Sequence, residues 1–370
     1  MSKTFLFTQQ SVGLGARKTS MVFLAEALAS RGWQTSVVTV QLSQLTRLKR
    51  NNRLNTIPHK ALNKWYDAGT MRGFVWVPLT HPIRFSTTLF NSFTRFLVRL
   101  YARQLPSSIL APLKDADLIV IESCVAVALF RQLRRAAPKA KFVYSMSDRL
   151  DVVGMHPALQ KMLVEDGPNY DLVRVPAELL LDDLPGANSV YIAHGLQKDA
   201  FDRVSDTPYS ARLNAVLAGD MMLDQAALSQ LAAAFPHVQF HYFGRVQLSP
   251  EYQHSNLKAY GEVPFETLAD YIKFADVGLA LYERRVGLEY IAQSSLKAIQ
   301  YRYCGLPIVT PDFAVSSEGN MFGYPVEDST RMIKAMEAAL ACGRQPQAEN
   351  SINDWNAVVK EILVNVHLPT

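Results

Sequence analysis

Cysteine, metal-ligand clusters and long apolar runs are all scarce in this chain of 370 residues. The three cysteines, Cys124, Cys304 and Cys342, are scattered and odd in number, so they provide neither a disulfide framework nor the spacing of a zinc site. Their pattern fits a reducing cytoplasm. No uncharged apolar run is long enough to span a bilayer, and the apolar stretch at Met1 to Thr8 is too short for a signal peptide. We therefore expect a protein that is soluble or bound to a membrane surface, with no transmembrane helix.

Acidic residues are almost missing from the first 110 residues. This part holds 15 lysines and arginines against Glu26 and Asp67, a formal charge of +13 in a chain whose total is +5. Such a region attracts anions, which include phospholipid head groups, nucleic acid and phosphorylated substrates. We expect no nucleic-acid partner, because aromatic and basic residues are not interleaved as in a recognised binding module.

Two common ligand motifs are also absent. The segment Gly13 to Ser20 is not a P-loop, because Arg17 stands before Lys18 where a P-loop has glycine. It remains a turn in which Arg17 and Lys18 open a helix, either as a phosphate site or as a plain strand-to-helix connection. Asp115 and Asp117 have the spacing of a metal-binding pair, but they precede a predicted strand and no histidine cluster accompanies them. No metal is therefore expected.

The fold class is indicated by alternation. Hydrophobic residues make up 49% of the chain and charged residues 19%, so a sizeable core can form. Short apolar runs alternate with helical patterns, which predicts parallel sheets joined by crossover helices, and the pattern restarts after a polar stretch at 197–212. We expect an α/β protein with two Rossmann-like, doubly wound domains, over residues 1–198 and 199–370, whose last helix can pack back on the first domain. The expected site is the cleft at the carboxyl ends of the strands.

A helix is predicted from Thr88 to Gln104 in the basic part. Arg95, Arg99 and Arg103 form a stripe on it, and another face is apolar, with Leu89, Phe93, Phe96, Leu97, Leu100 and Tyr101. One interpretation is a helix lying on an anionic membrane, helped by the cations between residues 47 and 53. The other is a helix packed on its sheet with a solvated arginine edge.

One carboxylate stands where a catalytic base is useful. Asp148 closely follows a strand predicted over 142–145, so it is expected at the carboxyl end of that strand. A carboxylate there can take a proton from an attacking hydroxyl. Asp151 is a nearby competitor, and aspartate is also common as a helix cap.

A second candidate site runs from Ala280 to Val309. A predicted strand ends at Tyr282, a basic loop follows, and Ser294 and Ser295 are expected to start a helix. Lys297 then lies in the first turn, where the helix dipole disfavours a cation unless an anion shares the site. The alternative is an ordinary amphipathic helix with a solvated lysine.

Several segments resemble the membrane-associated glucuronosyltransferase family of xanthan biosynthesis, and the similarity covers nearly the whole chain. These segments are I-E-S-C-V-A-V-A (121–128), K-F-V-Y-S-M-S-D (141–148), H-G-L (194–196), Y-G-E (260–262), Y-I-K-F-A (271–275) and S-S-L-K-A-I-Q-Y with G-L-P-I-V (294–301 and 305–309). The resemblance implies the GT-B fold, with an acceptor-binding N-terminal and a donor-binding C-terminal domain. It implies an inverting transfer, without metal or cofactor, from a UDP-sugar to a polyprenyl-diphosphate-linked oligosaccharide in exopolysaccharide synthesis. UDP-glucuronate is the expected donor, and the cytoplasmic face of the bacterial inner membrane the expected location.

The resemblance also assigns residues. Asp148 corresponds to the family's general base, and the residues that correspond to its nucleotide-binding set are Met221, Glu262, Tyr282, Leu296, Lys297 and Gln300. The family has methionine at the position of Leu296. Arg17 and Lys18 match a basic pair and are expected to face the acceptor diphosphate.

The donor sugar is the least determined element. Arg284 and Arg285 stand where a relative carries uncharged and acidic residues, and with Lys297 they are candidates for binding the donor's carboxylate or diphosphate. Retaining enzymes of this fold usually carry Glu-x7-Glu here. Glu289 is instead followed eight residues later by Lys297, which favours inversion. The alternatives are a UDP-sugar epimerase of the same fold and an inactive, membrane-bound partner of a polysaccharide complex.

Overall fold

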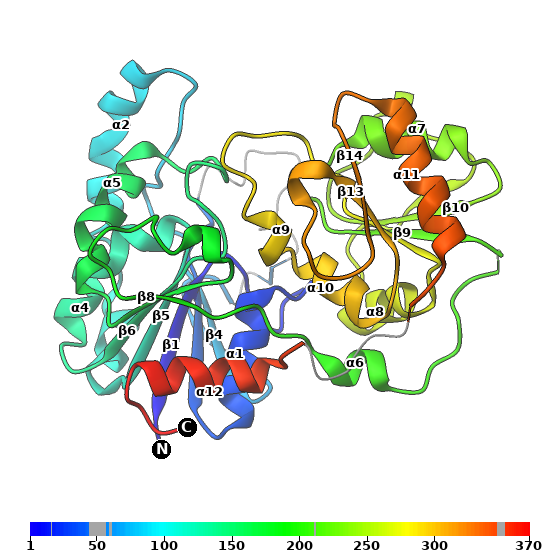
Figure 1. Ribbon diagram of the computed structural model, residues 1–370. Coiled ribbons are helices and arrows are strands. Elements are labelled where there is room, and N and C mark those ends of the chain that lie inside the picture. The colour runs from blue at the N-terminus through cyan, green and yellow to red at the C-terminus, as the bar shows by residue number, and fades with distance from the viewer. Residues whose placement is uncertain (16, 44–56, 59–60, 211, 346–351) are drawn as a thin grey trace. The chain divides into compact units, whose positions relative to one another are not determined.

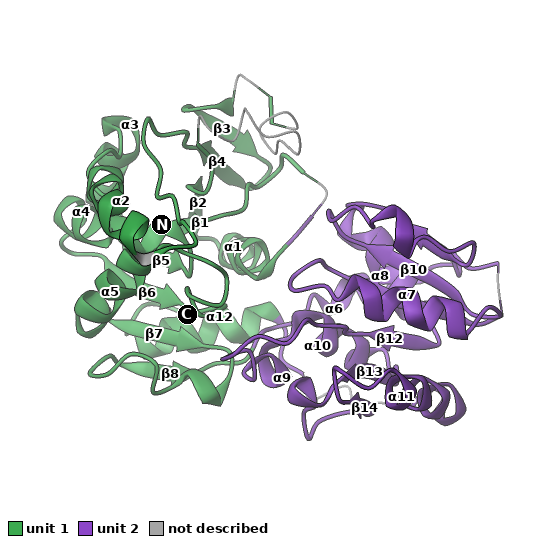
Figure 2. Ribbon diagram, turned by 90° about the horizontal axis from the view of Figure 1, so that it is seen from above, with its two compact units in different colours: residues 1–15, 19–193, 355–370 green, residues 16–18, 194–354 purple. Residues whose placement is uncertain are grey.

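The computed structural model describes residues 1–15, 17–43, 57–58, 61–210, 212–345 and 352–370 (Figure 1). They form two compact units (Figure 2). Unit 1 comprises residues 1–15, 19–193 and 355–370, and unit 2 comprises residues 16–18 and 194–354. The last helix, α12 (Trp355–Asn365), is part of unit 1, and unit 2 begins five residues before the predicted boundary after residue 198.

Unit 1 is built on an eight-stranded sheet in the order β3-β4-β2-β1-β5-β6-β7-β8. All pairs are parallel except the hairpin of β3 and β4. The central strands are almost fully buried, as expected for strands covered on both faces. The strands are β1 (Lys3–Thr8), β2 (Gln34–Thr39), β3 (Trp65–Ala68), β4 (Met71–Val75), β5 (Leu118–Glu122), β6 (Lys141–Ser145), β7 (Leu172–Val175) and β8 (Ser189–Tyr191).

The helices of unit 1 lie around this sheet (Figure 1). They are α1 (Ser20–Ser30), α2 (Thr88–Tyr101), α3 (Ser107–Leu110), α4 (Phe130–Ala136), α5 (Pro157–Asp166) and α12, with short 3₁₀ helices η4 (Ala111–Asp115), η5 (Val125–Leu129), η6 (Gly167–Asn169) and η7 (Glu178–Leu180). α12 lies beside α1 (Figure 1), where the rings of Phe23 and Trp355 stack with centroids 5.9 Å apart. Ser30 of α1 also donates to the side-chain oxygen of Asn356 at 3.4 Å. These contacts tie the end of the chain to unit 1.

Unit 2 contains a six-stranded, fully parallel sheet in the order β11-β10-β9-β12-β13-β14. Its strands are β9 (Asn214–Ala218), β10 (Gln239–Phe243), β11 (Leu257–Ala259), β12 (Val277–Leu279), β13 (Ile308–Pro311) and β14 (Met321–Tyr324). Its helices are α6 (Lys198–Asp202), α7 (Gln225–Ala234), α8 (Phe265–Phe274), α9 (Ile291–Ser294), α10 (Leu296–Tyr303) and α11 (Ser329–Cys342), with 3₁₀ helices η8 (Pro250–Tyr252) and η9 (Asp312–Ala314). The strand order reverses between β9 and β12, which is where doubly wound sheets bind ligands.

Two local predictions need correction. The strand expected to end at Tyr282 ends at Leu279, although Tyr282 still forms an isolated antiparallel bridge with Leu223. The helix expected to start at Ser294 is two short helices, because α9 ends at Ser294 and α10 begins after Ser295. Lys297 keeps its predicted place in the first turn of a helix. The predicted α/β architecture with two Rossmann-like sheets is confirmed.

The outer side of α2 is apolar, whereas much of its inner side is polar. Leu89, Phe93 and Phe96 are 77%, 74% and 48% exposed, whereas Asn91 and Thr94 are buried. The inner side is stabilised by hydrogen bonds, including two between Asn91 and the backbone of Phe85 at 2.8 and 2.9 Å. The interpretation in which the apolar face packs on the sheet is therefore wrong for Leu89, Phe93 and Phe96. In the part of the chain that the structure describes, no helix combines the length and apolarity needed to cross a bilayer.

Candidate functional site

Asp148 lies just beyond the carboxyl end of β6, in unit 1. Its backbone is fixed by Ser123, which follows the neighbouring strand β5. The Oγ of Ser123 accepts hydrogen bonds from the amides of Ser147 and Asp148, each at 3.1 Å. Ser123 itself is buried, so this anchor is shielded from water. The parallel pairing of β5 and β6 thus places the candidate base.

Asp148 lines a small polar pocket of about 190 Å³. The other lining residues are Tyr144, Met146, Arg149, Leu150, Asp151, Gln160, Leu163 and Asp183. Arg149 is held there by a bidentate pair with Asp183, at 2.6 and 2.8 Å. Among the described residues, the buried hydroxyl of Tyr144 has no hydrogen-bond partner. The walls thus combine carboxylate, guanidinium, amide and hydroxyl groups, which suits a ligand rich in hydroxyls such as a sugar.

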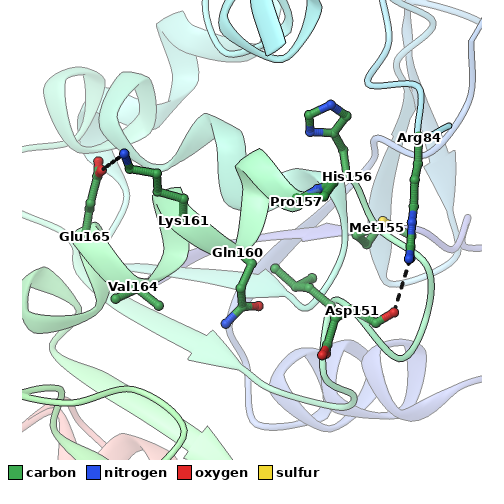
Figure 3. Close-up of a pocket in the computed structure, with 10 residues that line it drawn as sticks. Arg84, Asp151, Met155, His156, Pro157, Gln160, Lys161, Val164 and Glu165 are labelled. Atoms are coloured by element: carbon green, nitrogen blue, oxygen red, sulfur yellow. Dashed lines mark hydrogen bonds and ion pairs between the residues drawn. The ribbon is translucent and has the colours of Figure 1, made fainter. Parts of the chain in front are cut away.

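A larger and mostly apolar pocket of about 530 Å³ (Figure 3) adjoins the polar one, and Leu150, Asp151 and Gln160 line both. Arg84 reaches into it and donates to the carbonyl oxygen of Asp151 at 3.3 Å. His156 lines it as well, and its Nε2 contacts the carbonyl oxygen of Asn91 in α2 at 3.0 Å. The apolar pocket therefore lies next to the inner side of α2. Asp151, the competitor of Asp148, belongs to both pockets.

The predicted anion site of unit 2 is built around the start of α10. Ser295 is its N-cap and accepts from the amide of Ala298 at 3.3 Å, and its Oγ lies 2.8 Å from the hydroxyl of Tyr282. The ammonium of Lys297 lies over the ring of Tyr282, 4.7 Å from the centroid. The N-terminal end of a helix dipole is positive, so the start of α10 and the ammonium together favour an anion. Desolvation lowers the pKa of Lys297 to about 8, although the nearby Asp220 acts in the opposite direction.

Asp220 is the centre of an ion-pair cluster that the sequence did not reveal. It follows β9, and its carboxylate is 3.1 Å from Nη1 of Arg17 and 3.3 Å from Nε of Arg245. Glu262 lies 3.9 Å from Arg17 and 3.5 Å from Arg245. Burial raises the pKa of Asp220, but Arg17 and Arg245 outweigh it, so the pKa is lowered. Asp220 is therefore an ionised carboxylate between two guanidinium groups.

Gly219 forms the turn between β9 and Asp220, and Lys297 lies beside it. Its φ of +86° lies in the region that favours glycine, and a Cβ there would be 3.7 Å from Cε of Lys297. The turn after β9 thus brings Asp220 within electrostatic reach of Lys297, as the effect of Asp220 on its pKa shows.

The other residues predicted to bind the donor divide into two groups: some lie in or beside α10 or next to Asp220 in the chain, and the others lie in a separate loop. Met221 follows Asp220 in the chain and is partly buried, Leu296 is the first residue of α10, and Gln300 is buried in the same helix. Arg284 and Arg285 are instead in an exposed loop, where they pair with Glu327 at 3.8 Å and with Glu283 at 3.4 Å.

The basic pair predicted for the acceptor diphosphate is bound by acids of unit 2. Arg17 contacts Asp220, and Lys18 lies 3.7 Å from Glu266. The structure therefore brings Arg17 to the residues of the predicted donor site. Within the described residues, no group of three or more histidine, cysteine, aspartate or glutamate side chains could hold a metal ion.

Comparisons with known proteins place this chain near glucuronosyltransferases. Residues 6–176 match the family model described as glucuronosyltransferase GumK, N-terminal domain. The UDP-glucuronate:glycolipid 2-beta-glucuronosyltransferase of Xanthomonas campestris pv. campestris is 28% identical over 331 residues, which is 89% of this chain and 82% of that protein. The predicted resemblance is thereby confirmed.

Solved structures of glycosyltransferases show the same fold. The α,α-trehalose-phosphate synthase (UDP-forming) of Burkholderia xenovorans has a TM-score of 0.59 at 12% identity, covering 99% of this chain and 96% of that one. AviGT4, a glycosyltransferase of avilamycin A biosynthesis, has a TM-score of 0.56 at 11% identity, covering 98% and 97%. At these identities the likeness shows the fold alone, which is GT-B.

Proposed function

We propose that this chain, a glycosyltransferase of the GT-B fold that resembles the xanthan glucuronosyltransferases, transfers glucuronic acid from UDP-glucuronate to a lipid-diphosphate-linked oligosaccharide. The transfer inverts the anomeric centre and needs neither metal nor cofactor. The observation that supports the proposal is the cation at the start of α10, where Lys297 lies over Tyr282, Tyr282 contacts Ser295, and Asp220 is nearby. The Xanthomonas relative, which is named for UDP-glucuronate and a glycolipid, supports the choice of substrates.

In the proposed reaction Asp148 acts as the general base. Its carboxylate takes the proton of an acceptor hydroxyl, and that oxygen attacks the anomeric carbon from the face opposite UDP. The bond between the anomeric carbon and the UDP oxygen breaks, and the electron pair stays on the diphosphate. Attack from the opposite face inverts the configuration. Asp148, whose backbone amide is held by Ser123, suits this role, since inversion needs no second, nucleophilic carboxylate.

The negative charge that develops on UDP must be stabilised without a metal. The ammonium of Lys297 and the positive end of the α10 helix dipole can do this, because fixed donors and charges stabilise a leaving group without reorganising. Donors of this kind are typically worth about 3–4 kcal/mol each in the transition state. That magnitude makes a metal unnecessary for departure of UDP.

The acceptor is proposed to bind to unit 1. Its terminal sugar fits the polar pocket that contains Asp148, where hydroxyl, amide and carboxylate groups can bind sugar hydroxyls. Its lipid would remain in a membrane on which the protein lies as a peripheral protein, at the cytoplasmic face of the inner membrane. The exposed apolar side of α2 supports this location, because Leu89, Phe93 and Phe96 can enter the interface region of a bilayer. The exposed Arg95, Arg99 and Arg103 can contact anionic head groups.

A donor screen tests the proposal. Several UDP-sugars are incubated with the protein, and release of UDP is measured with and without a lipid-linked oligosaccharide. We expect UDP-glucuronate to give the fastest release, and only slow hydrolysis without acceptor. Turnover of a UDP-sugar to another UDP-sugar without acceptor would instead identify an epimerase. Absence of both UDP affinity and turnover would indicate an inactive partner.

A further inference from the structure

The cation beside Asp220 that no sequence motif indicated is Arg245, in the turn after β10. Its backbone amide donates to Oδ2 of Asp220 at 3.1 Å, and its Nε lies 3.3 Å from the same oxygen. Its Nε is also 3.5 Å from Oε1 of Glu262. The backbone of Arg245 is thus anchored independently of its side chain. The guanidinium rests between two carboxylates of unit 2.

We infer that Arg245 binds the diphosphate of the nucleotide donor. The inference rests on the proposed UDP-sugar substrate and adds a residue to its site. Three cations, Arg17, Arg245 and Lys297, are within electrostatic reach of two carboxylates, Asp220 and Glu262. The three cations exceed the two carboxylates by one positive charge. An anionic ligand would neutralise this excess.

The exposure of the existing ion pairs indicates that the Arg245 side chain can exchange its partner for a ligand. The side chains of Arg245 and Glu262 are 38% and 37% exposed, so their ion pair is partly solvated and contributes little to stability. Asp220 is only 8% exposed and keeps the amide of Arg245 and the guanidinium of Arg17 as partners when the Arg245 side chain moves. Exchange of Glu262 for a phosphate therefore costs little. A planar guanidinium can also bind phosphate through two parallel hydrogen bonds, which a lysine cannot do.

The position of Arg245 favours the diphosphate over the sugar carboxylate. Arg245 follows β10 and Asp220 follows β9, at the carboxyl ends of two paired strands next to the point where the strand order reverses. The turn at Gly219 also brings the Lys297 side chain close to Asp220. Arg245 and Lys297 thus both lie near Asp220. Arg284 and Arg285, by contrast, pair with other acids in an exposed loop.

Nucleotide titrations of Arg245→Ala test the inference. Binding of uridine, UDP, UDP-glucose and UDP-glucuronate is measured by calorimetry, or by NMR titration where it is weak. We expect the variant to lose about 10- to 100-fold in affinity for all three diphosphates and to bind uridine like the unmodified protein. Arg245→Lys should lose less, because the charge remains. The matched control is Arg203→Ala, since Arg203 is also 38% exposed and paired with an acid of unit 2, Asp270.

Three results would overturn the inference. Unchanged UDP affinity would show that Arg245 does not contact the ligand. An equal loss for uridine would show damage to the nucleotide site rather than a missing phosphate contact. A loss confined to UDP-glucuronate would assign Arg245 to the sugar carboxylate. If the unmodified protein fails to bind UDP, both the proposed donor and the inference about Arg245 are wrong. The first three results contradict only the inference and leave the proposed donor intact.

Discussion

Ser123 holds Asp148 in place: its Oγ accepts the hydrogen bond of the Asp148 amide at 3.1 Å, and it also accepts from the amide of Ser147. The two residues follow neighbouring parallel strands, β5 and β6. The direction of the chain at the candidate base is thus set by one buried hydroxyl. The catalytic role proposed for Asp148 makes this contact testable.

Removing that hydroxyl should affect catalysis more than binding. In Ser123→Ala the amide of Asp148 loses this acceptor, whereas the amide of Ser147 keeps the carbonyl oxygen of Ser145 at 3.1 Å. The loss costs about 1–3 kcal/mol of stability. We expect kcat to fall about tenfold or more, because a small displacement of the base weakens proton transfer. The KM for UDP-glucuronate should stay the same, since Ser123 is in unit 1. Ser123→Thr, which keeps the hydroxyl, should restore much of kcat, and an unchanged kcat in the alanine variant would contradict the positioning role.

The two carboxylates of the polar pocket should behave differently. Asp148→Asn removes the proposed base and should lower kcat by about 10²- to 10⁴-fold, with UDP affinity unchanged. Asp151→Asn is the matched control in the same pocket and should retain most of the activity. Both are measured as transfer rate and as UDP affinity. If the Asp151 variant is inactive and the Asp148 variant active, the assignment of the base is reversed.

Donor affinity should depend on pH through Lys297. Desolvation lowers its pKa to about 8, so the ammonium is mostly charged near pH 7 and mostly neutral near pH 9. Because the charged form binds the anion, UDP affinity should fall as pH rises through about 8, by about tenfold between pH 7 and 9. Lys297→Ala should bind UDP more weakly and without this pH dependence. Calorimetric titration at several pH values checks both, and an equal slope in the two proteins would exclude Lys297.

The exposed apolar side of α2 predicts membrane binding that depends on two phenylalanines. Phe93→Asp with Phe96→Asp should abolish flotation with anionic liposomes, because burying each ring is worth about 1.5–3 kcal/mol. Both side chains are exposed, so the melting temperature should change little.

Charge reversal of Arg95, Arg99 and Arg103 measures the electrostatic contribution to membrane binding separately. This triple variant should lose flotation mainly at low salt, because salt screens contacts with head groups. Flotation of both variants at the level of the unmodified protein would exclude α2 from membrane contact.

Much of the fold could be predicted from local pattern. Apolar runs such as 118–122 are buried on both faces, and their spacing with helical segments indicates a parallel sheet. β3 escaped prediction because it is a half-exposed edge strand, W-Y-D-A, without a clear alternation. α10 starts two residues after the expected Ser294, because Ser294 and Ser295 are equally good caps by sequence and it is Ser295, in contact with Tyr282, that accepts from the amide of Ala298.

The sequence could indicate candidate site residues only where one residue is informative by its own position in the chain. Asp148 and Lys297 stand out because each lies next to a strand end or a helix start. The cluster of Asp220 and Arg245 was not predictable, since these residues are 25 positions apart and meet through the pairing of β9 with β10. The orientation of α2 was ambiguous for another reason. Helical spacing shows which residues share a face, but the partners Phe85 and His156 decide that Asn91 and Thr94 face inward.

The central claim is an inverting transfer of glucuronic acid, and the anomeric configuration of the product tests it most directly. The protein is incubated with UDP-glucuronate and a lipid-linked oligosaccharide, and the new linkage is examined by NMR spectroscopy. We predict a glucuronosylated product with the anomeric configuration opposite to that of the donor, formed about 10²- to 10⁴-fold more slowly by Asp148→Asn than by the unmodified protein. A product with the donor's configuration, or transfer by Asp148→Asn at the rate of the unmodified protein, would contradict the account.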